Sequence, residues 1–182
     1  MAKPIVLIGG ASGAGKTTLA GKLKAELGLD HFIGTGFIRA IVQSQTTREA
    51  DPDLFSMTFQ SPDPVAHIVR QARRLHGAVQ SCIDRAHREG TSIVIEGTHL
   101  IPELYHDAAV DLYVVLRAPD AIAHAEWVRG DTHAHRTIDE ADLSNIRLID
   151  DYLRAEAAAY GVQTVDPQQE ALLRALIGSV VR

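Results

Sequence analysis

A chain of 182 residues, 46% of them hydrophobic and 23% charged, can bury a core as one domain, which excludes a disordered protein. The net charge of -5 disfavours nucleic acid as a partner, because an acidic surface repels a phosphate backbone. No apolar run approaches the roughly 20 residues of a membrane span, and the lone Cys82 cannot form an internal disulfide, so we expect a cytoplasmic protein with no membrane partner.

The first 64 residues suggest two strands, a helix and a loop. The apolar residues 6–8 end at two glycines, which predicts a buried strand that stops at a turn. Leucines at steps of four then predict a helix that ends at Gly28. His31–Gly34 is expected to be a second short strand. Residues 46–64 contain three prolines and are expected to form an irregular loop on the substrate side.

A long amphipathic helix is predicted next. Between residues 65 and 86, apolar side chains recur at steps of three and four, and Gly90 follows as a helix end. Strands are expected at residues 92–95 and 110–116, where short apolar runs recur.

Two further helices are predicted after these strands. Pro119 is placed to open a helix that ends near Gly130. Thr137 and Glu140 have the spacing of a capping box, so another helix is expected to begin there. The apolar face of this helix would consist of Leu143, Ile146, Ile149, Leu153 and Ala157.

The chain is expected to close with a strand at residues 163–165 and a helix at 172–177. Strands that alternate with helices predict an α/β fold, in which a parallel sheet is covered by helices on both faces.

Residues 10–17, GASGAGKT, match the Walker A pattern G-x-x-x-x-G-K-[ST]. Glycines allow the backbone to form an anion-sized nest, and the following helix adds the positive end of its dipole. Lys16 is expected to reach the β- and γ-phosphates of ATP, and the Thr17 hydroxyl to bind Mg²⁺. The same residues could form a glycine turn that binds nothing, but the strand–loop–helix context favours a P-loop NTPase fold. The predicted nucleotide-binding residues are Gly10, Ala11, Ser12, Gly13, Ala14, Gly15, Lys16, Thr17 and Thr18.

Glu96 and His99 follow a predicted buried strand. Glu96 is interpreted as a catalytic base or a Mg²⁺ ligand, with a capping or salt-bridging glutamate as the alternative. His99 either contacts the substrate or packs in the turn before Pro102. Arg39, one turn into the helix after the second strand, is expected to face the phosphate acceptor.

The polar segment between Arg129 and Arg136 is interpreted as a lid at about residues 130–137, whose two arginines stabilise the transferring phosphoryl group. A solvated helix–helix loop is the alternative. His133 and His135 lie in this segment, but no further ligand cluster nearby supports a metal site.

Two stretches resemble the 2-phosphoglycerate kinase family, namely LIGGASGAGKTTLAGKLKAELGL with FIGTGFIRAIV, and CIDRAHREGTSIVIEGTHLIPEL. They cover roughly residues 5–45 and 65–105 and are similar also to zeta-toxin kinases. The resemblance implies an adenylate-kinase-like fold of five parallel strands, a single kinase domain over residues 1–182, ATP and Mg²⁺ as cofactors, and a small hydroxy acid as acceptor. Thr35, Arg39 and His99 are the expected substrate-binding residues.

Gly36 departs from this family, whose members usually carry an aspartate at the matching position after the second strand. That aspartate would be the base for the acceptor hydroxyl, and glycine cannot take a proton. Glu96 is the best replacement. The alternatives are a nucleotide or nucleoside kinase, or an ATP-binding regulatory module with weakened catalysis. A GTPase is disfavoured because no N-K-x-D motif is found.

Overall fold

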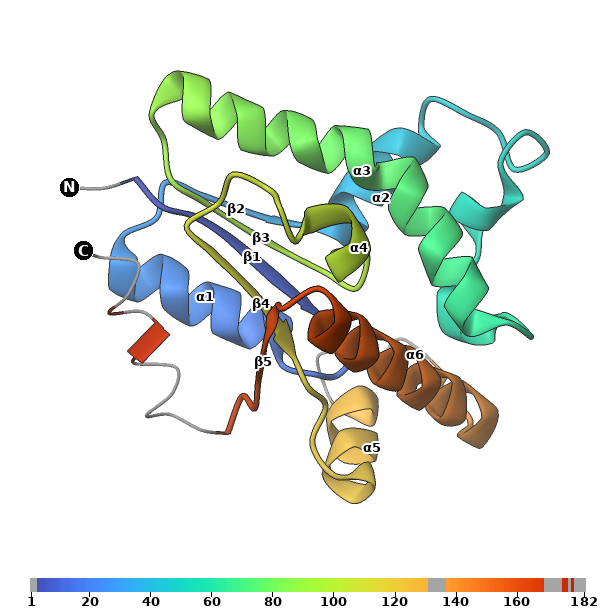
Figure 1. Cartoon of the computed structure of the whole chain (residues 1–182). Helices are drawn as coiled ribbons and strands as arrows, with labels where there is room; N and C mark the ends of the chain where they lie inside the picture. The colour runs from blue at the N-terminus through green and yellow to red at the C-terminus, as the bar shows by residue number, and fades with distance from the viewer. Residues whose placement is uncertain (1–2, 131–136, 169–174, 177, 179–182) are drawn as a thin grey trace.

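Five parallel strands form one sheet in the order β2-β3-β1-β4-β5 in the computed structural model, which describes residues 3–130, 137–168, 175, 176 and 178 (Figure 1). The central strand, β1, is buried along its whole length. The strands are β1 (Ile5–Gly10), β2 (His31–Gly34), β3 (Ile93–Glu96), β4 (Leu112–Leu116) and β5 (Gln163–Val165).

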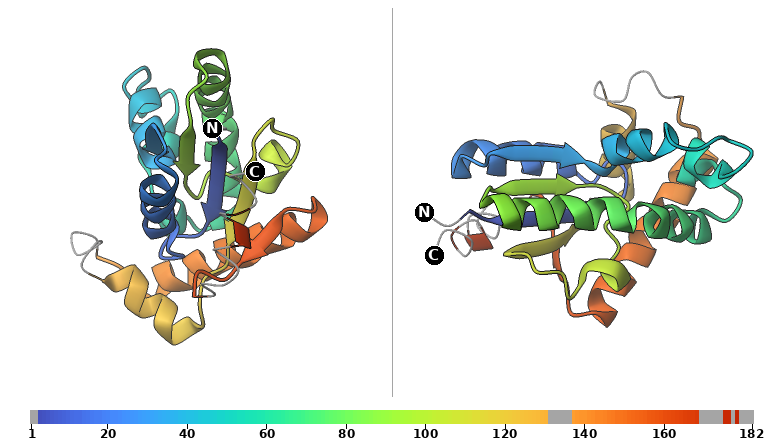
Figure 2. Two further views of the ribbon diagram at one scale, coloured as in Figure 1. Left: turned by 90° about the vertical axis from the view of Figure 1, so that its left-hand side faces the viewer. Right: turned by 90° about the horizontal axis from the view of Figure 1, so that it is seen from above.

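Helices lie on both faces of the sheet (Figure 2). The helices are α1 (Lys16–Leu27), α2 (Thr35–Gln43), α3 (Pro64–Glu89), α4 (Pro102–Tyr105), α5 (Ala121–Arg129) and α6 (Glu140–Ala159). Two short 3₁₀ turns, η1 (Pro52–Phe55) and η2 (Thr58–Gln60), lie between α2 and α3. The segment predicted as irregular therefore contains local turns, whose Leu54 and Phe59 are buried.

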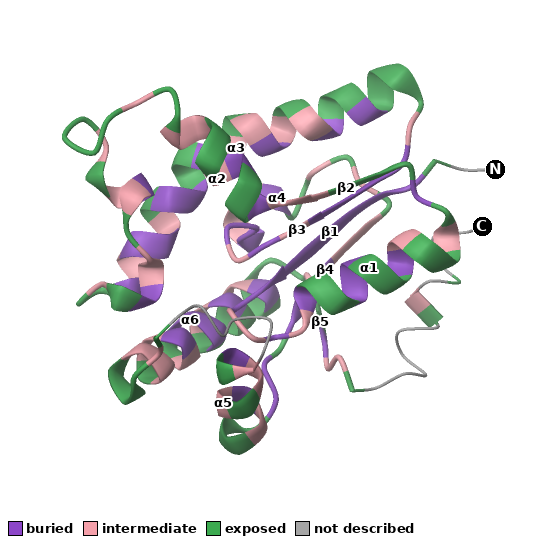
Figure 3. Cartoon of the chain, turned by 180° about the vertical axis from the view of Figure 1, so that it is seen from behind, coloured by how far each residue is buried: buried purple, intermediate pink, exposed green. Residues whose placement is uncertain are grey.

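Alternate residues of β1 enter different parts of the core. Val6 and Ile8 pack with apolar residues of α1 on one face, and Leu7 packs with residues of α3 on the other. This two-fold alternation is expected of a strand that is covered on both sides. Figure 3 shows the buried central strand β1 between helices whose outer faces are exposed.

The parallel register aligns the carboxyl ends of three strands. Glu96 of β3 is paired with Ile8 of β1 on one side and with Gly34 of β2 on the other. The loop after β1, the start of α2 and the end of β3 therefore meet at one edge of the sheet. In open α/β sheets this edge is where ligands bind.

The strands at 31–34 and 163–165 and the helices that end at Gly28 and Gly90 are confirmed. β4 begins two residues later than predicted, at Leu112. The last predicted helix, at 172–177, lies largely outside the described residues.

The capping box of α6 was assigned to the wrong pair of residues. Thr137 lies before the helix, and Asp139 is the N-cap. The Asp139 carboxylate accepts the Asp142 N–H at 2.8 Å, and the Asp142 carboxylate accepts the Asp139 N–H at 3.3 Å. Aspartate forms the same reciprocal pair as threonine with glutamate, so the spacing alone could not choose between the two.

Asp139→Ala should lower the free energy of unfolding by about 1 kcal/mol, because the first turn of α6 loses its cap. Urea denaturation of the purified protein measures this change. Thr137→Ala is the control and should change it by less than about 0.5 kcal/mol. The opposite ranking of the two variants would show that Thr137 caps the helix.

Candidate active site

The loop after β1 has a backbone that requires glycine at residue 13. Gly13 has φ 74°, and a Cβ there would overlap the Val128 side chain of α5. The loop leads directly into α1, whose first backbone N–H groups have no intrahelical partners. The predicted P-loop thus has the strand–loop–helix context that phosphate binding needs.

Lys16 and Thr17 begin α1 and face two different partners. The Lys16 ammonium donates a hydrogen bond to the Ala11 carbonyl at 2.6 Å, so its side chain lies over the loop. The Thr17 hydroxyl donates to Glu96 Oε1 at 3.1 Å. Oxygens that share an octahedral Mg²⁺ site at ~2.1 Å are about 3.0 Å apart, so this separation suits two ligands of one ion.

A cavity of about 940 Å³ extends along this edge of the sheet. We divide its lining into two halves, named for the ligands that the sequence predicts, with Lys16, Thr17 and Glu96 between them. The nucleotide half is lined by Ser12, Gly13, Gly15, Thr18, Leu19, Lys22, Glu126, Trp127, Gly130, Pro167 and Gln168. The acceptor half is lined by Thr35, Gly36, Arg39, Met57, Thr58, Phe59, Gln71, Gly97, Thr98 and His99.

Two residues of α5 on the nucleotide side were missed by the sequence analysis. The His124 ring nitrogen Nε2 lies 2.7 Å from the Ser12 carbonyl, to which it donates. Burial lowers the pKa of His124, which keeps the ring neutral and leaves Nδ1 able to accept from Arg147 at 3.4 Å. Trp127 lies beside the loop, as does Pro167, and both add apolar surface to the cavity. Three-residue spacing puts His124 and Trp127 on one side of the helix, but nothing local marks them.

The predicted substrate residues Thr35, Arg39 and His99 come together in the acceptor half. The Thr35 hydroxyl is 2.8 Å from His99 Nδ1, and His99 Nε2 is 2.9 Å from Gln71 Oε1. Burial, with the nearby cations Arg39 and Lys16, lowers the pKa of His99 to about 3. His99 is therefore neutral at physiological pH. It both lines the cavity and packs in the turn, so the two interpretations of this residue are compatible.

Two glycines shape the acceptor half in opposite ways. A Cβ at Gly97 would overlap the Thr35 side chain, so only glycine allows the end of β3 to approach α2 this closely. Gly36 has no such constraint, because its φ is not positive and an added Cβ would meet no atom within 4 Å. A carboxylate can be introduced at Gly36 without backbone strain.

The predicted lid falls largely outside the described residues, including Arg136, His133 and His135. Arg129 is described. Its side chain is exposed and donates a hydrogen bond to Glu140 at 2.5 Å. Arg129 is not among the described residues that line the cavity. Over residues 3–130 and 137–168, no cluster of three or more histidine, cysteine or acidic side chains could hold a metal.

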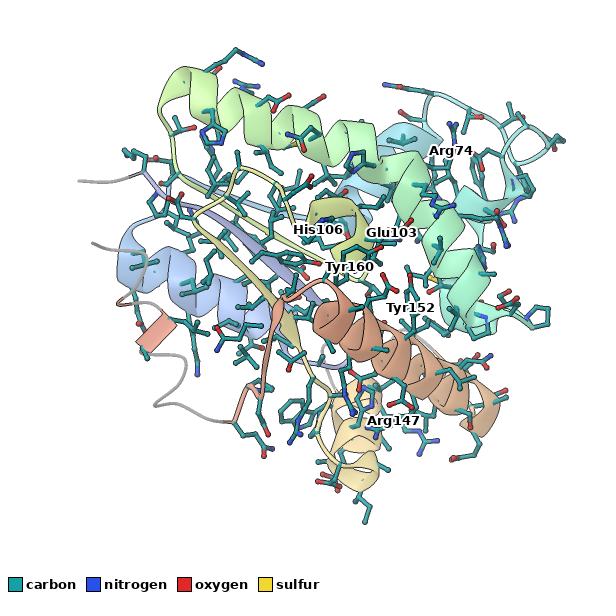
Figure 4. All side chains as sticks on the ribbon, viewed as in Figure 1. Arg74, Glu103, His106, Arg147, Tyr152 and Tyr160 are labelled. Carbon is teal, nitrogen blue, oxygen red and sulfur yellow. The ribbon has the colours of Figure 1, made fainter. Side chains whose placement is uncertain are left out.

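Three arginines on the polar side of α3 form ion pairs. Arg70 binds Asp53 at 2.6 Å, Arg74 binds Asp51 at 2.6 Å, and Arg73 binds Glu103 of α4 at 2.9 Å. Figure 4 labels Arg74 on α3 and Glu103 on α4. None of the three lines the cavity. The pairs with Asp51 and Asp53 instead hold the η1 segment against α3.

A family model described as an AAA domain matches residues 6–146. The chain belongs to this family. The match includes the loop after β1, the acceptor half and Glu96. Within the described residues, no helix of this AAA domain is long and apolar enough to cross a membrane.

The chain is also similar to 2-phosphoglycerate kinases, which confirms the resemblance. It is 29% identical over 180 residues to that of Methanocaldococcus jannaschii, covering 89% of this chain and 58% of the relative. It is 29% identical over 178 residues to that of Thermococcus kodakarensis, covering 88% and 60%. The chain therefore spans about three fifths of the length of these curated relatives.

Among solved structures, the fold is similar to shikimate kinase from Acinetobacter baumannii in complex with shikimate. The TM-score is 0.58 with 14% identity, covering 98% of this chain and 91% of that one. The five-stranded parallel sheet with helices on both faces is thus confirmed, and the matching family model agrees with a P-loop NTPase fold.

Lys16→Ala and Thr17→Ala should each lower ATP turnover by ~10²–10³-fold, because each removes a group aimed at phosphates or metal. ADP formation measures turnover, and thermal denaturation checks the fold. Lys24→Ala is the control on the same helix, since its ammonium bonds the Leu29 carbonyl. Normal turnover in folded Lys16→Ala would contradict the assignment of the P-loop.

Proposed function

We propose that this chain is an ATP- and Mg²⁺-dependent phosphotransferase that moves the γ-phosphoryl group of ATP to a hydroxyl of a small molecule. The hydrogen bond between Thr17 and Glu96 carries this proposal. It joins the P-loop to the acceptor half of the cavity at the point where a transferring phosphoryl group would lie. Similarity to the 2-phosphoglycerate kinases supports the same reaction class.

The residues of the P-loop side would bind the phosphates and Mg²⁺ and supply positive charge. Lys16 leaves the Ala11 carbonyl to bind the β- and γ-phosphates, and the N-terminus of α1 binds the phosphate oxygens. Mg²⁺, held by Thr17 and by Glu96 through water, would neutralise the charge that develops on the phosphates. Arg129 and Arg136 would add positive charge when the segment between them closes over ATP.

The acceptor half supports an anionic hydroxy acid as acceptor. Arg39 offers a guanidinium to a carboxylate or phosphate and is held at the cavity by the Ser56 carbonyl at 3.3 Å. Thr35 and His99 add neutral polar groups. A phosphoglycerate-like hydroxy acid is the first candidate, in line with the relatives' names.

A nucleoside or nucleotide kinase is the second candidate. Met57 and Phe59 also line the acceptor half, and their apolar surface would suit a base. ADP formation from ATP, measured with 2-phosphoglycerate, other hydroxy acids, sugars and nucleosides in turn, separates the two. Turnover that depends on a hydroxy acid supports the first candidate. Tight ATP binding without any acceptor-dependent turnover would overturn both and favour a regulatory module.

Glu96 is proposed to replace the base that is missing at Gly36. One oxygen of its carboxylate binds Thr17, which leaves the second for the proton of the acceptor hydroxyl. Glu96→Gln keeps the size and the contact with Thr17 but removes the basicity. It should lower acceptor-dependent kcat by ~10²–10⁴-fold while ATP binding changes little.

Gly36→Asp also tests whether Glu96 is the base, because it restores the carboxylate that is missing at residue 36. If Glu96 is the base, the added carboxylate should raise kcat by less than about 2-fold and repel an anionic acceptor. Gly36→Asn is the neutral control. A gain of ~10²-fold in Gly36→Asp, together with full activity in Glu96→Gln, would show that Gly36 marks a lost base and that Glu96 is not its replacement.

A further inference from the structure

Gln71 is a buried amide in the first half of α3 whose side chain forms hydrogen bonds with two other parts of the chain. Its side chain is fully buried. The amide nitrogen donates to the Asp53 carbonyl and, at 2.9 Å, to the Ser56 carbonyl, both at η1. The amide oxygen lies 2.9 Å from His99 Nε2, on the loop after β3. A buried polar group retains such a place in a core only when its hydrogen bonds are made.

These contacts determine which group donates and which accepts in each hydrogen bond from Gln71 through His99 to Thr35. The two carbonyls only accept, so the amide nitrogen must face them and the amide oxygen must face His99. His99 Nε2 therefore carries the proton. Since the ring is neutral, Nδ1 is bare and accepts from the Thr35 hydroxyl at 2.8 Å. Gln71 thus selects the tautomer of His99 and the orientation of Thr35.

The same amide joins two walls of the acceptor half. The first, the 56–59 wall, contains Met57, Thr58 and Phe59. The second, the Thr35–His99 wall, lies at the carboxyl ends of β2 and β3. Arg39 reaches the first wall through the same Ser56 carbonyl that Gln71 holds. Loss of the amide would leave the His99 Nε2–H without its acceptor, Gln71 Oε1. The Asp53 and Ser56 carbonyls would lose one donor each and keep their contacts with His67 and Arg39.

We propose that Gln71 is a positioning residue for the phosphoryl acceptor, which ties the 56–59 wall to the Thr35–His99 wall and keeps both ready for the acceptor. This inference rests on the proposed phosphotransferase function. It concerns only the acceptor half, since the hydrogen bonds of Gln71 among the described residues go to Asp53, Ser56, His67 and His99 and not to the P-loop.

Gln71→Leu tests whether the hydrogen bonds of Gln71 hold the two walls together. It should lower kcat/KM for the acceptor by ~10–10²-fold through misplacement of the acceptor, while the Kd of ATP stays within about 2-fold. Gln80→Leu is the matched control, because Gln80 lies on the same helix and its side chain, within the part of the chain that the structure describes, bonds Asp84 alone. Amide hydrogen exchange at residues 52–59 should become faster in Gln71→Leu and not in Gln80→Leu.

Gln71→Glu tests the tautomer. The new carboxylate would face His99 Nε2 and raise the pKa of His99 against the opposing charges of Arg39 and Lys16 and the neighbouring His67. As pH falls through the raised pKa, Nδ1 gains a proton and can no longer accept from Thr35. Acceptor-dependent kcat/KM should then fall on the acid side, a step absent from the wild type and from Gln71→Leu. Gln80→Glu should not show it.

Nitrogen NMR of the histidines follows the tautomer and titration of His99 directly, without any acceptor. Failure of the wild type to phosphorylate any acceptor would refute the proposed function, whereas exchange and NMR would still decide the role of Gln71. Equal losses of ATP and acceptor binding in Gln71→Leu would overturn the inference. So would unchanged exchange at 52–59, or a His99 titration in Gln71→Glu that matches the wild type.

Discussion

The parallel register of β1, β2 and β3 places three chemically different segments at one edge of the sheet. Because Glu96 lies opposite both Ile8 and Gly34, the carboxylate at the end of β3 is next to the P-loop and next to the start of α2. The hydrogen bond from Thr17 to Glu96 depends directly on this alignment. A shift of one residue would turn Glu96 to the opposite face of the sheet and separate the two groups.

The two halves of the cavity are built by different means. The nucleotide half depends on backbone geometry, since Gly13 fits closely against α5 and His124 holds the Ser12 carbonyl. The acceptor half depends on side chains that come from α2, α3 and the loop after β3. For the proposed function this difference matters, because every nucleoside triphosphate presents similar phosphates, whereas acceptors differ in shape and charge.

Burial and nearby positive charge keep the histidine of the acceptor half neutral. His99 is desolvated beside Arg39 and Lys16, so it stays neutral and serves as a hydrogen-bonding group. The segment before α3 is attached to this helix by exposed ion pairs of Arg70 and Arg74 and by the buried amide of Gln71. The exposed pairs contribute little each, of the order of 0–1 kcal/mol, so the buried amide is the more specific of the two attachments.

The amino-acid sequence by itself determined the local elements and the chemistry of the phosphate loop. Periodicity located α1 and α3, glycines located their ends, and the Walker A pattern located Lys16 and Thr17, because each of these signals depends on neighbours in the chain. The capping box of α6 was misplaced by two residues because several polar residues near one helix start satisfy the same spacing.

Only the tertiary structure decided which of these residues act together. Contact between Glu96 and Thr17, and the grouping of Thr35, His99 and Gln71, join residues that are 79, 64 and 28 positions apart. In the sequence, Gln71 is one polar residue among many on a long helix. Its role is set by which groups the folded chain buries beside it, since a buried amide must find partners and thereby fixes their orientation.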